Sequence, residues 1–204
     1  MNIRIYVSIC TFIFVLLSIT INSKDAKEYN YSYQGKEDAS YILVEYASLS
    51  CVHCANFHNK RLTAIKEKLI DTGKLKYVYK DFPLDFPAMK ASMLTHCFKN
   101  KQYFDILNTL FRNQKKWIVE SDNDDKLTKA FHSILKEHGL TSEKIASCIQ
   151  FPENSKANKV KWDFILSSRL EGQKKGVNST PTFFLNGKKL EGLVTLKLLE
   201  EHIY

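Results

Sequence analysis

Residues 41–47, YILVEYA, are followed closely by CVHC at residues 51–54, and this junction decides the fold. The first stretch is apolar and aromatic, as a buried central strand is, and a helical pattern runs from Ala55 to Ile70 after the second. Two cysteines separated by two residues can form a disulfide across one helical turn. The first sulfur, at the helix N-terminus, also meets unpaired N–H groups and the positive end of the helix dipole, which stabilise a thiolate. The motif therefore favours redox chemistry, although zinc sites and structural disulfides share its spacing.

Length and composition indicate one domain, or one domain carrying an insertion, because the chain has 204 residues. Apolar residues make up 44% and charged residues 25%, which is typical of a globular protein with a real core. The net charge is +8, but only four of the 30 basic residues are arginine. Nucleic-acid-binding proteins rely on arginine for bidentate contacts, and no basic cluster here interleaves with aromatic side chains. We therefore expect a solvated lysine surface, with weak attraction to an anionic membrane as the alternative.

The first 23 residues have the pattern of a secretory signal. Arg4 gives a basic start, residues 5–21 carry no charge, and a polar stretch begins at Asn22. The cleavage context around Ser23 is mediocre and the apolar run is at the short limit for spanning a membrane, so a retained anchor is the alternative. Cys10 has no small residue before it, which disfavours lipid modification. Residues 1–23 are therefore expected to be a signal peptide or an uncleaved anchor, leaving four cysteines in an oxidising compartment.

Beyond the junction, strands are expected on both sides of a long helical region. Residues 75–80 predict a strand that completes a right-handed strand–helix–strand unit, and residues 29–33 a short edge strand. From residue 86 to about residue 175 the sequence shows helix start and stop signals and no convincing strand. Residues 182–191 contain the Asn-Gly turn signal of a β-hairpin, and a terminal helix is expected at residues 195–202.

This order resembles the thioredoxin fold with an inserted helical domain, as in the DsbA family of exported thiol:disulfide oxidoreductases. Three features carry the resemblance. They are CVHC at the strand-to-helix junction, the sequence STPTFFLNG at residues 179–187, which looks like the family's cis-proline loop and following hairpin, and Glu45, where members place a buried acid beneath the active site. The resemblance covers nearly all of the chain after the signal segment.

The resemblance implies an α/β protein. Its thioredoxin domain would consist of residues 24–85 and 176–204, and the helical insertion would span residues 86–175. The sequence departs from the family at Val52, because the family oxidase usually has proline there. This dipeptide tunes the redox potential, so the reaction class is better determined than the direction of electron flow.

Cys51 is the expected nucleophile. Cysteines in such motifs at helix starts have pKa values of about 3.5–7 instead of about 8.5. A lowered pKa stabilises the reduced form, which makes the disulfide a stronger oxidant. Cys54 is expected to be the buried resolving partner. Two alternatives remain open: an inert structural disulfide, or a zinc site formed by Cys51, Cys54 and His58, for which no second ligand pair is evident.

His53 lies between the two sulfurs, where a cationic or N–H-donating ring would favour the thiolate; an ordinary surface histidine is the alternative. In the family the buried acid lies close to the second sulfur, which implies that Glu45 relays the proton of Cys54. A glutamate inside an apolar strand is costly unless it is paired or protonated, so an ion-paired or uncharged core residue is the other interpretation. Lys80, at the end of the second strand, is the candidate partner.

Pro181 corresponds to the family's cis-proline. Its missing N–H and the exposed backbone of Thr180 would let a substrate strand pair beside the disulfide, and Val52 would contact the same substrate. An ordinary trans-proline turn is the alternative reading of these residues.

Cys97 and Cys148 both lie late in helices expected in the insertion, where some relatives carry a second cysteine pair. We expect a structural disulfide between them, with two buried free thiols as the alternative. The bridge would enclose about fifty residues, and the loop-entropy relation gives it about 4 kcal/mol of stabilisation.

The leading hypothesis is a periplasmic oxidase that donates its Cys51–Cys54 disulfide to newly translocated, reduced and unfolded proteins. The resemblance implies reoxidation by a quinone-linked membrane protein of the DsbB type. We expect a monomer with no cofactor, no metal and no nucleic-acid partner. The alternatives are a disulfide reductase or isomerase of the same fold, although the chain has no room for the dimerisation domain of most such isomerases, and a chaperone or binding module with a structural CxxC. The apolar N-terminus disfavours a cytosolic isomerase acting on glutathione conjugates.

Overall fold

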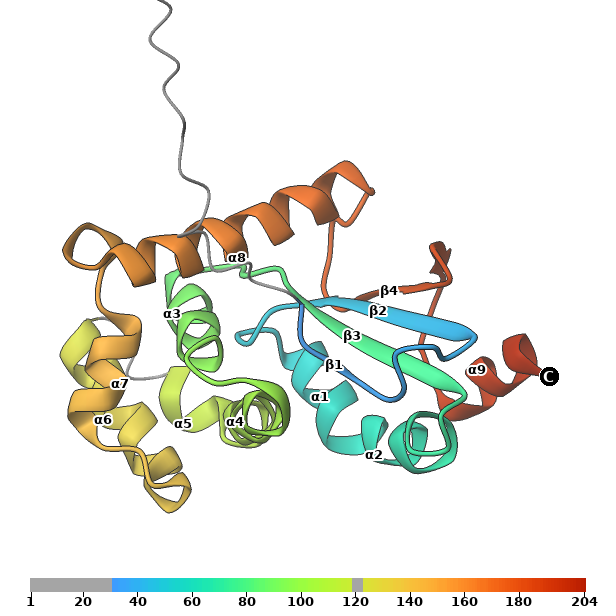
Figure 1. The fold of residues 1–204 in the computed structure, drawn as a ribbon, viewed down its shortest axis with the longest axis horizontal. Coiled ribbons are helices and arrows are strands. Elements are labelled where there is room, and N and C mark those ends of the chain that lie inside the picture. The colour runs from blue at the N-terminus through green and yellow to red at the C-terminus, as the bar shows by residue number, and fades with distance from the viewer. Residues whose placement is uncertain (1–30, 119–122) are drawn as a thin grey trace, which may run out of the picture.

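The computed structural model describes residues 31–118 and 123–204 (Figure 1). Within these residues the chain forms a five-stranded mixed sheet with the order β1-β3-β2-β4-β5. The strands are β1 (Tyr33–Gln34), β2 (Tyr41–Ala47), β3 (Leu75–Asp81), β4 (Thr182–Leu185) and β5 (Lys188–Leu190). The signal segment expected at residues 1–23 lies outside the described residues, as does the start of the edge strand expected at residues 29–33.

Strand β2 is the centre of the sheet. It runs parallel to β3, from Tyr41 opposite Leu75 to Ala47 opposite Asp81. On its other side it pairs antiparallel with β4, which returns from the far end of the sequence. The loop that follows β2 therefore lies at one end of the sheet, with β3 on one side and β4, which is distant in the sequence, on the other.

The two faces of the sheet carry separate apolar clusters, because successive strand residues point to opposite sides. On one face, Leu43 and Ala47 belong to the main core, which also contains Phe57, Ile65 and Leu199. This face is covered by α1 (Val52–Lys60), α2 (Leu62–Ile65), its π-helical continuation (Lys66–Ile70) and α9 (Leu196–Ile203) (Figure 1). On the other face lies a smaller cluster consisting of Tyr46, Phe82, Val177 and Phe184.

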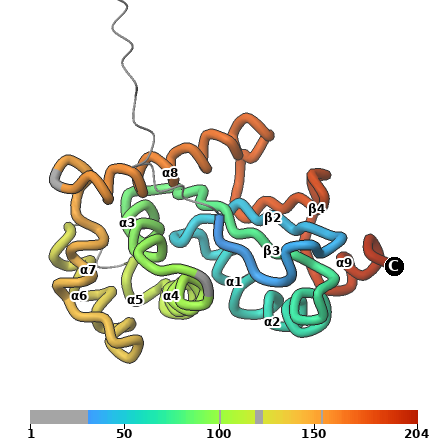
Figure 2. Tube along the Cα trace, viewed as in Figure 1, coloured from blue at the N-terminus to red at the C-terminus, as the bar shows by residue number. Residues whose placement is uncertain are grey.

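A helical insertion separates β3 from β4. Among the described residues it contains α3 (Phe86–Thr95), α4 (Asn100–Arg112), α5 (Gln114–Ile118), α6 (Asp124–Leu135), α7 (Ser142–Ile149) and α8 (Lys156–Lys174), with short 3-10 turns at Lys136–His138 and Pro152–Asn154. These helices form a lobe beside the sheet, and α8 runs from that lobe back across the second face (Figure 2). The thioredoxin fold with a helical insertion is therefore confirmed.

Helix α8 approaches the sheet closely at Gly172. A Cβ atom added there would lie 2.9 Å from the Tyr46 ring and 3.0 Å from the Phe82 ring, so only glycine lets the helix lie this near to β2. The carbonyl of Gly172 also accepts a hydrogen bond from the Val177 N–H. These contacts hold the end of the insertion against the strand that precedes the CVHC motif.

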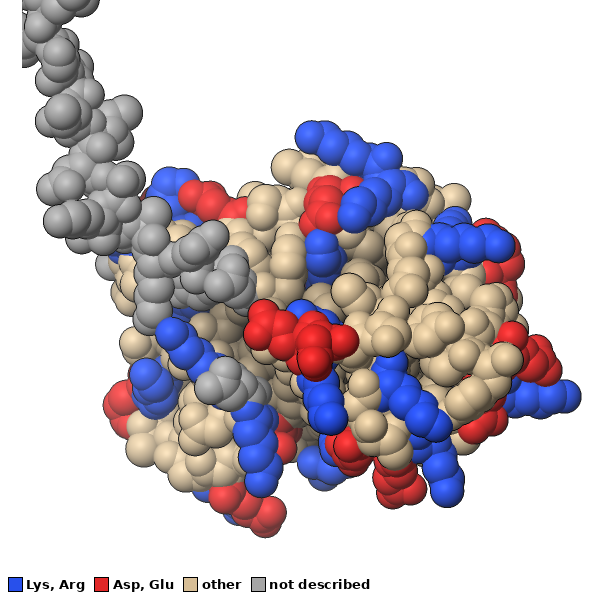
Figure 3. All heavy atoms as spheres, turned by 45° about the vertical axis from the view of Figure 1, so that its right-hand side comes forward, with Lys and Arg blue, Asp and Glu red and all other residues tan. Residues whose placement is uncertain are grey.

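One face of the molecule shows how its surface charges are distributed. On the face drawn in Figure 3, lysine and arginine side chains are scattered among acidic ones, as expected for a solvated lysine surface. Within residues 31–118 and 123–204, no helix is both long enough and apolar enough to cross a bilayer.

Candidate active site

The CVHC motif forms the beginning of α1. Cys51 is the N-cap residue, with extended backbone angles (φ −78°, ψ 121°), and its sulfur accepts a hydrogen bond from the Cys54 N–H at 3.3 Å. A sulfur at this position takes the place of the oxygen with which serine or aspartate usually caps a helix. The Cys51 N–H donates to the Ser48 carbonyl at 3.0 Å, which fixes the loop between β2 and α1.

The Cys51 sulfur is stabilised as a thiolate. Its pKa is lowered from 9.0 to about 6, mainly because the Cys54 thiol donates a hydrogen bond to it. The side chain of Thr180 and the backbone N–H groups of Cys54 and His53 act in the same direction, while burial of the sulfur opposes them. A thiol with such a pKa is mostly ionised at neutral pH.

Cys54 is placed in the opposite environment. Its side chain is fully buried, and this burial raises its pKa far above that of an ordinary thiol. The hydrogen bond to Cys51 and the negative charge of Glu45 raise it further. Both cysteines are free thiols in the structure. One motif therefore combines an easily ionised sulfur with one that holds its proton tightly.

The loop before β4 completes the surroundings of Cys51. The Thr180–Pro181 peptide bond is cis, the geometry that the resemblance implies. The Cys51 thiol lies 3.2 Å from the Thr180 carbonyl and donates a hydrogen bond to it. The side chain of Val52 is 58% exposed beside these groups, and that of His53 is also exposed. The contribution of His53 that lowers the Cys51 pKa comes from its backbone N–H.

Glu45 is buried on the face of the sheet that packs against α1. The Nε2 atom of His58 lies 3.1 Å from Glu45 Oε2, and the Tyr77 hydroxyl donates a hydrogen bond to the same oxygen. The other ring nitrogen of His58, Nδ1, lies 3.2 Å from Asn108 Oδ1 on α4. Both ring nitrogens of His58 are thus engaged by side chains other than the two cysteines. Within residues 31–118 and 123–204, no group of three potential ligands is placed to hold a metal.

The expected pairing of Glu45 with Lys80 is wrong. Glu45 and its β3 neighbour Tyr79 share one face of the sheet, whereas Lys80, the next residue in β3, points to the other. There the Lys80 ammonium donates to both carboxylate oxygens of Glu171 on α8, at 2.6 and 2.8 Å. Partial burial alone would raise the pKa of Glu171, but hydrogen bonds from Lys175, Lys80 and Tyr31 lower it to about 2.

The insertion reaches the active-site loop through Gln114. Its side-chain Nε2 donates to the carbonyls of Leu49 and Cys51, at 2.8 and 2.9 Å, and the residue is buried. Sequence reasoning missed this contact, as it missed the role of His58 beside Glu45. The spacing of His58, four residues after Cys54 on one helical face, was a usable signal for burial. The Gln114 contact joins parts of the chain about sixty residues apart, and no local pattern indicates it.

A groove adjoins the cysteines. It has a volume of about 340 Å³ and lies between α1 and the cis-proline loop, with His53, Phe57, Pro181 and Leu193 among its lining residues. Leu193 is 63% exposed, so the groove offers apolar surface to a molecule docked beside Cys51.

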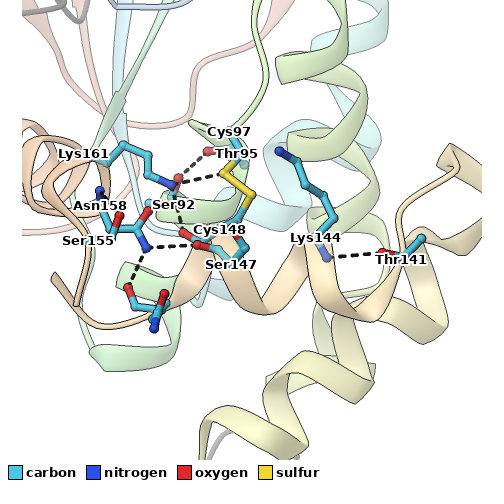
Figure 4. Close-up of a disulfide and its surroundings, with 11 residues drawn as sticks. Ser92, Thr95, Cys97, Thr141, Lys144, Ser147, Cys148, Ser155, Asn158 and Lys161 are labelled. Carbon is cyan, nitrogen blue, oxygen red and sulfur yellow. Dashed lines mark hydrogen bonds between the residues drawn. A yellow bond between two sulfur atoms is a disulfide. The ribbon is translucent and has the colours of Figure 1, made fainter.

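The second cysteine pair lies in the helical insertion, away from this groove. The Cys97 and Cys148 sulfurs are joined in a disulfide, with Cα atoms 6.0 Å apart, and the bridge ties the turn after α3 to α7 (Figure 4). The Lys161 ammonium on α8 lies 3.1 Å from the Cys97 sulfur and donates to the Cys148 carbonyl at 2.9 Å. Burial, together with the charge of Lys144, lowers the pKa of Lys161 to about 8.

An N-capping sulfur with a lowered pKa, a buried partner sulfur and a cis-proline loop on this fold define the class of thioredoxin-fold thiol:disulfide exchange proteins. The family model described as Thioredoxin matches residues 27–204. The chain belongs to this family, among its DsbA-like thiol:disulfide oxidoreductases.

Individual relatives agree with this assignment. The crystal structure of α-DsbA1 from Wolbachia pipientis is 32% identical in sequence, with a TM-score of 0.73, and the match covers 86% of this chain and 90% of that one. The thiol-disulfide exchange protein α-DsbA2 from the same organism is 26% identical, with a TM-score of 0.64 and 85% of each chain covered. A Rickettsia typhi protein, named for protein-disulfide oxidoreductase activity, is 28% identical over 77% of this chain and 55% of its own length. The chain thus spans about half the length of the curated relatives it matches.

Proposed function

We propose that the protein is an exported thiol:disulfide oxidoreductase that donates its Cys51–Cys54 disulfide to newly translocated, unfolded proteins. The observation that carries this proposal is the Cys51 sulfur at the start of α1, whose pKa is lowered to about 6. Groups that stabilise a thiolate stabilise the reduced protein relative to the disulfide. The oxidised protein therefore tends to pass its disulfide on.

The transfer has two steps. A substrate thiolate attacks the Cys51 sulfur, the Cys51–Cys54 bond breaks, and Cys54 leaves as a thiolate that takes up a proton. The second substrate thiolate then attacks the substrate sulfur of the mixed disulfide, and Cys51 leaves as a thiolate. The substrate loses two electrons and gains a disulfide, and the protein gains the same two electrons as a dithiol.

Each residue around the cysteines has a part in these steps. The raised pKa of Cys54 ensures that it is protonated once it is released, so that it does not attack the mixed disulfide again. Glu45 is the nearby group through which that proton would pass. Val52, Thr180 and Pro181 form the surface against which an extended substrate segment would lie, and the adjoining groove would accept one of its apolar side chains.

The proposed setting follows from the family. Two of the similar proteins are named DsbA. This similarity supports the proposal that the protein acts in the periplasm on reduced, unfolded exported proteins. The same resemblance supports reoxidation by a quinone-linked membrane protein of the DsbB type. We propose that the protein acts as a monomer and that the reaction needs only the two cysteines, without a cofactor.

The test is the equilibrium of the Cys51–Cys54 pair with glutathione, measured across a series of ratios of reduced to oxidised glutathione. We expect the dithiol to persist at ratios at which ordinary structural disulfides are fully formed. If the pair instead has a reduction potential as low as that of thioredoxin, about −270 mV, the protein is a disulfide reductase and the oxidase proposal is wrong. Alkylation of Cys51 with a midpoint near pH 8.5 would remove the basis of the proposal altogether.

A further inference from the structure

A second histidine of the active-site helix lies between the buried cysteine and a large cleft. His58 follows Cys54 by four residues, so both side chains point inward from the same face of α1. The His58 ring bonds to Glu45 through Nε2 and to Asn108 through Nδ1, and it stacks on Phe111 at a centroid distance of 4.1 Å. The ring is therefore fixed in one orientation, with one nitrogen toward the acid and the other toward α4.

The cleft beyond His58 has a volume of about 1260 Å³. His58 and Asn108 line it, together with residues of β1, α2 and the loop before α4. Asn108 is half-buried, whereas Glu45 is fully buried and His58 is only 6% exposed. The cleft thus brings solvent to the Nδ1 side of the ring, while the Nε2 side faces the closed core.

The hydrogen bonds fix which atoms can carry a proton. An amide oxygen only accepts, so His58 Nδ1 carries a hydrogen when it bonds to Asn108 Oδ1. A further proton is then shared between Nε2 and Glu45 Oε2, which also accepts from the Tyr77 hydroxyl. The other carboxylate oxygen, Glu45 Oε1, is buried and has no hydrogen-bond partner among the described residues. The charge of Glu45 acts on the Cys54 thiol and raises its pKa, so the unpaired oxygen is the atom of this acid left to exchange a proton with that sulfur.

We propose that His58 is a positioning residue that carries protons between Glu45 and the water of this cleft, so that the buried Cys54 can gain or lose its proton during each disulfide exchange. The proposal rests on the proposed function and adds the route by which the resolving thiol exchanges its proton with solvent. It explains why a histidine, and not an apolar residue, lies in the core beneath the CVHC motif.

Proton and electron counts balance along this route. In the oxidised protein the neutral ring carries its hydrogen on Nε2, and Nδ1 is bare. When Cys54 leaves the disulfide as a thiolate, Glu45 gives it a proton, His58 gives Glu45 a proton through Nε2, and cleft water protonates the bare Nδ1. The reduced protein, which the structure shows, then has the tautomer whose Nδ1–H bonds to Asn108 Oδ1. During reoxidation the Cys54 thiol gives its proton to Glu45, the same transfers run in reverse, and the Cys54 thiolate attacks the mixed disulfide at Cys51. The electron pair moves only between sulfur atoms.

Other ionisable groups face the His58 ring from β3, from α1 and from the walls of the cleft. From β3, Tyr77 and Tyr79 face His58, and burial raises the pKa of both well above its ordinary value, so they stay neutral. On α1, Cys54 lies one turn before His58 on the same buried face. The ionisable side chains that line the cleft besides His58 are Tyr31, Tyr33, Lys66, Glu67, Asp71, His96, Lys99, Lys101, Asp105 and Arg112.

The test follows Cys54 directly. The protein is prepared with glutathione in a mixed disulfide on Cys51, and the release of glutathione by Cys54 is followed from pH 5 to pH 9. General acid–base catalysis contributes about 100-fold or more, so we expect His58→Gln to slow the release by about 10- to 100-fold. Its rate should then rise in proportion to hydroxide, while the unmodified protein reaches a plateau. Imidazole added to His58→Ala should restore the rate, because the cleft opens at the missing ring.

The chain offers a matched control in another buried histidine–carboxylate pair. His96 Nε2 lies 2.7 Å from Asp81 Oδ2, with both side chains at most 5% exposed. His96→Gln should leave glutathione release within twofold of the unmodified rate. Equal slowing by His96→Gln and His58→Gln, an unchanged rate and pH profile in His58→Gln, or no rescue of His58→Ala by imidazole would each overturn the proposal.

Alkylation of Cys51 separates this inference from the proposed function. In His58→Gln the alkylation midpoint should stay near pH 6, because backbone N–H groups and the neighbouring thiol lower the pKa of that sulfur. If the unmodified protein itself shows an ordinary Cys51 thiol, the oxidase proposal fails on its own evidence, and the proton route fails with it.

Discussion

The two cysteine pairs of this chain differ in almost every physical respect. Cys51 and Cys54 are separated by two residues, lie at a helix start and are free thiols. Cys97 and Cys148 are 51 positions apart, connect two helical segments and form a disulfide. Fixed backbone N–H groups face the Cys51 sulfur, whereas a side-chain ammonium from Lys161 faces Cys97.

Both pairs consist of the same kind of thiol, so the difference lies in their surroundings. The number of residues between the two cysteines and the charged or N–H groups facing the sulfur determine whether a pair is reactive or structural. A disulfide between residues only three positions apart restricts the unfolded chain little, so it adds little stability and is easily reduced. A disulfide that closes a long loop removes much conformational entropy from the unfolded state. We therefore expect the first pair to control activity and the second to control stability, and each experiment below tests that division.

The largest expected effect is on catalysis. Cys51→Ser should reduce disulfide transfer to a reduced, denatured client protein to the uncatalysed background, a loss of at least about a thousandfold. The double variant Cys97→Ser with Cys148→Ser should retain most of the activity. Recovery of client activity at substoichiometric protein is the measurement. Full catalysis by Cys51→Ser would make the CxxC pair a structural element and the protein a chaperone.

The next effect is on stability. Removing the second disulfide by the same double variant should lower the free energy of unfolding by about 4 kcal/mol, because the closed loop contains about fifty residues. Urea denaturation of the variant and the unmodified protein gives this difference. Reduction of Cys51 and Cys54 alone serves as the comparison and should have a much smaller effect at pH 5. Equal losses from the two pairs would contradict the division proposed here.

The third effect is a pH dependence that belongs to the first pair alone. The folded-state pKa of Cys51 is depressed to about 6, so its contribution to stability is complete above the unfolded pKa and is lost as the pH falls through 6. The reduced protein should therefore gain about 2 to 3 kcal/mol between pH 5 and pH 8, relative to the oxidised protein. Above about pH 8.5 the gain should stop, because the raised pKa of Cys54 acts in the opposite direction. Urea midpoints of both redox forms across this range provide the check.

The smallest expected effect is on the pKa of Cys51, and it distinguishes the backbone of His53 from its side chain. The His53 ring is exposed, and the contribution of this residue to the lowered Cys51 pKa comes from its backbone N–H and is smaller than that of the Cys54 thiol. His53→Ala should therefore raise that pKa by only about a few tenths of a unit. His53→Pro keeps the first helical turn but removes the N–H, so it should raise the pKa by more than His53→Ala does. The pH dependence of Cys51 alkylation measures both, and a larger effect of alanine than of proline would assign the stabilisation to the imidazole.

The sequence predicted the parts of the molecule that local patterns control. The strand before CVHC, the helix after it, the helical insertion and the Asn-Gly hairpin all depend on neighbouring residues, and the structure has each of them. The reaction class followed from the same motif. The position of Cys51 at the helix start also predicted the direction of its pKa shift.

What the sequence did not predict depends on contacts between distant segments. The sequence suggests Lys80 as the partner of Glu45, because both are charged residues of neighbouring strands, but the alternation of strand residues places them on opposite faces. The real neighbour of Glu45, His58, comes from the helix that packs on that face. The large cleft and the Asn108 contact arise only once α4 lies against α1, so no periodicity in either segment indicates them.

The contact of Gln114 with Leu49 and Cys51 has a consequence for protein engineering. One amide group from the insertion holds two carbonyls of the loop that precedes the reactive sulfur. If the insertion were replaced by a short linker, the carbonyls of Leu49 and Cys51 would lose this hydrogen-bond donor and the loop would no longer be held in place. The CVHC motif placed in a thioredoxin domain without the helical insertion should therefore not reproduce the reactivity of this protein. Part of the loop around Cys51 is held by Gln114, which belongs to that insertion.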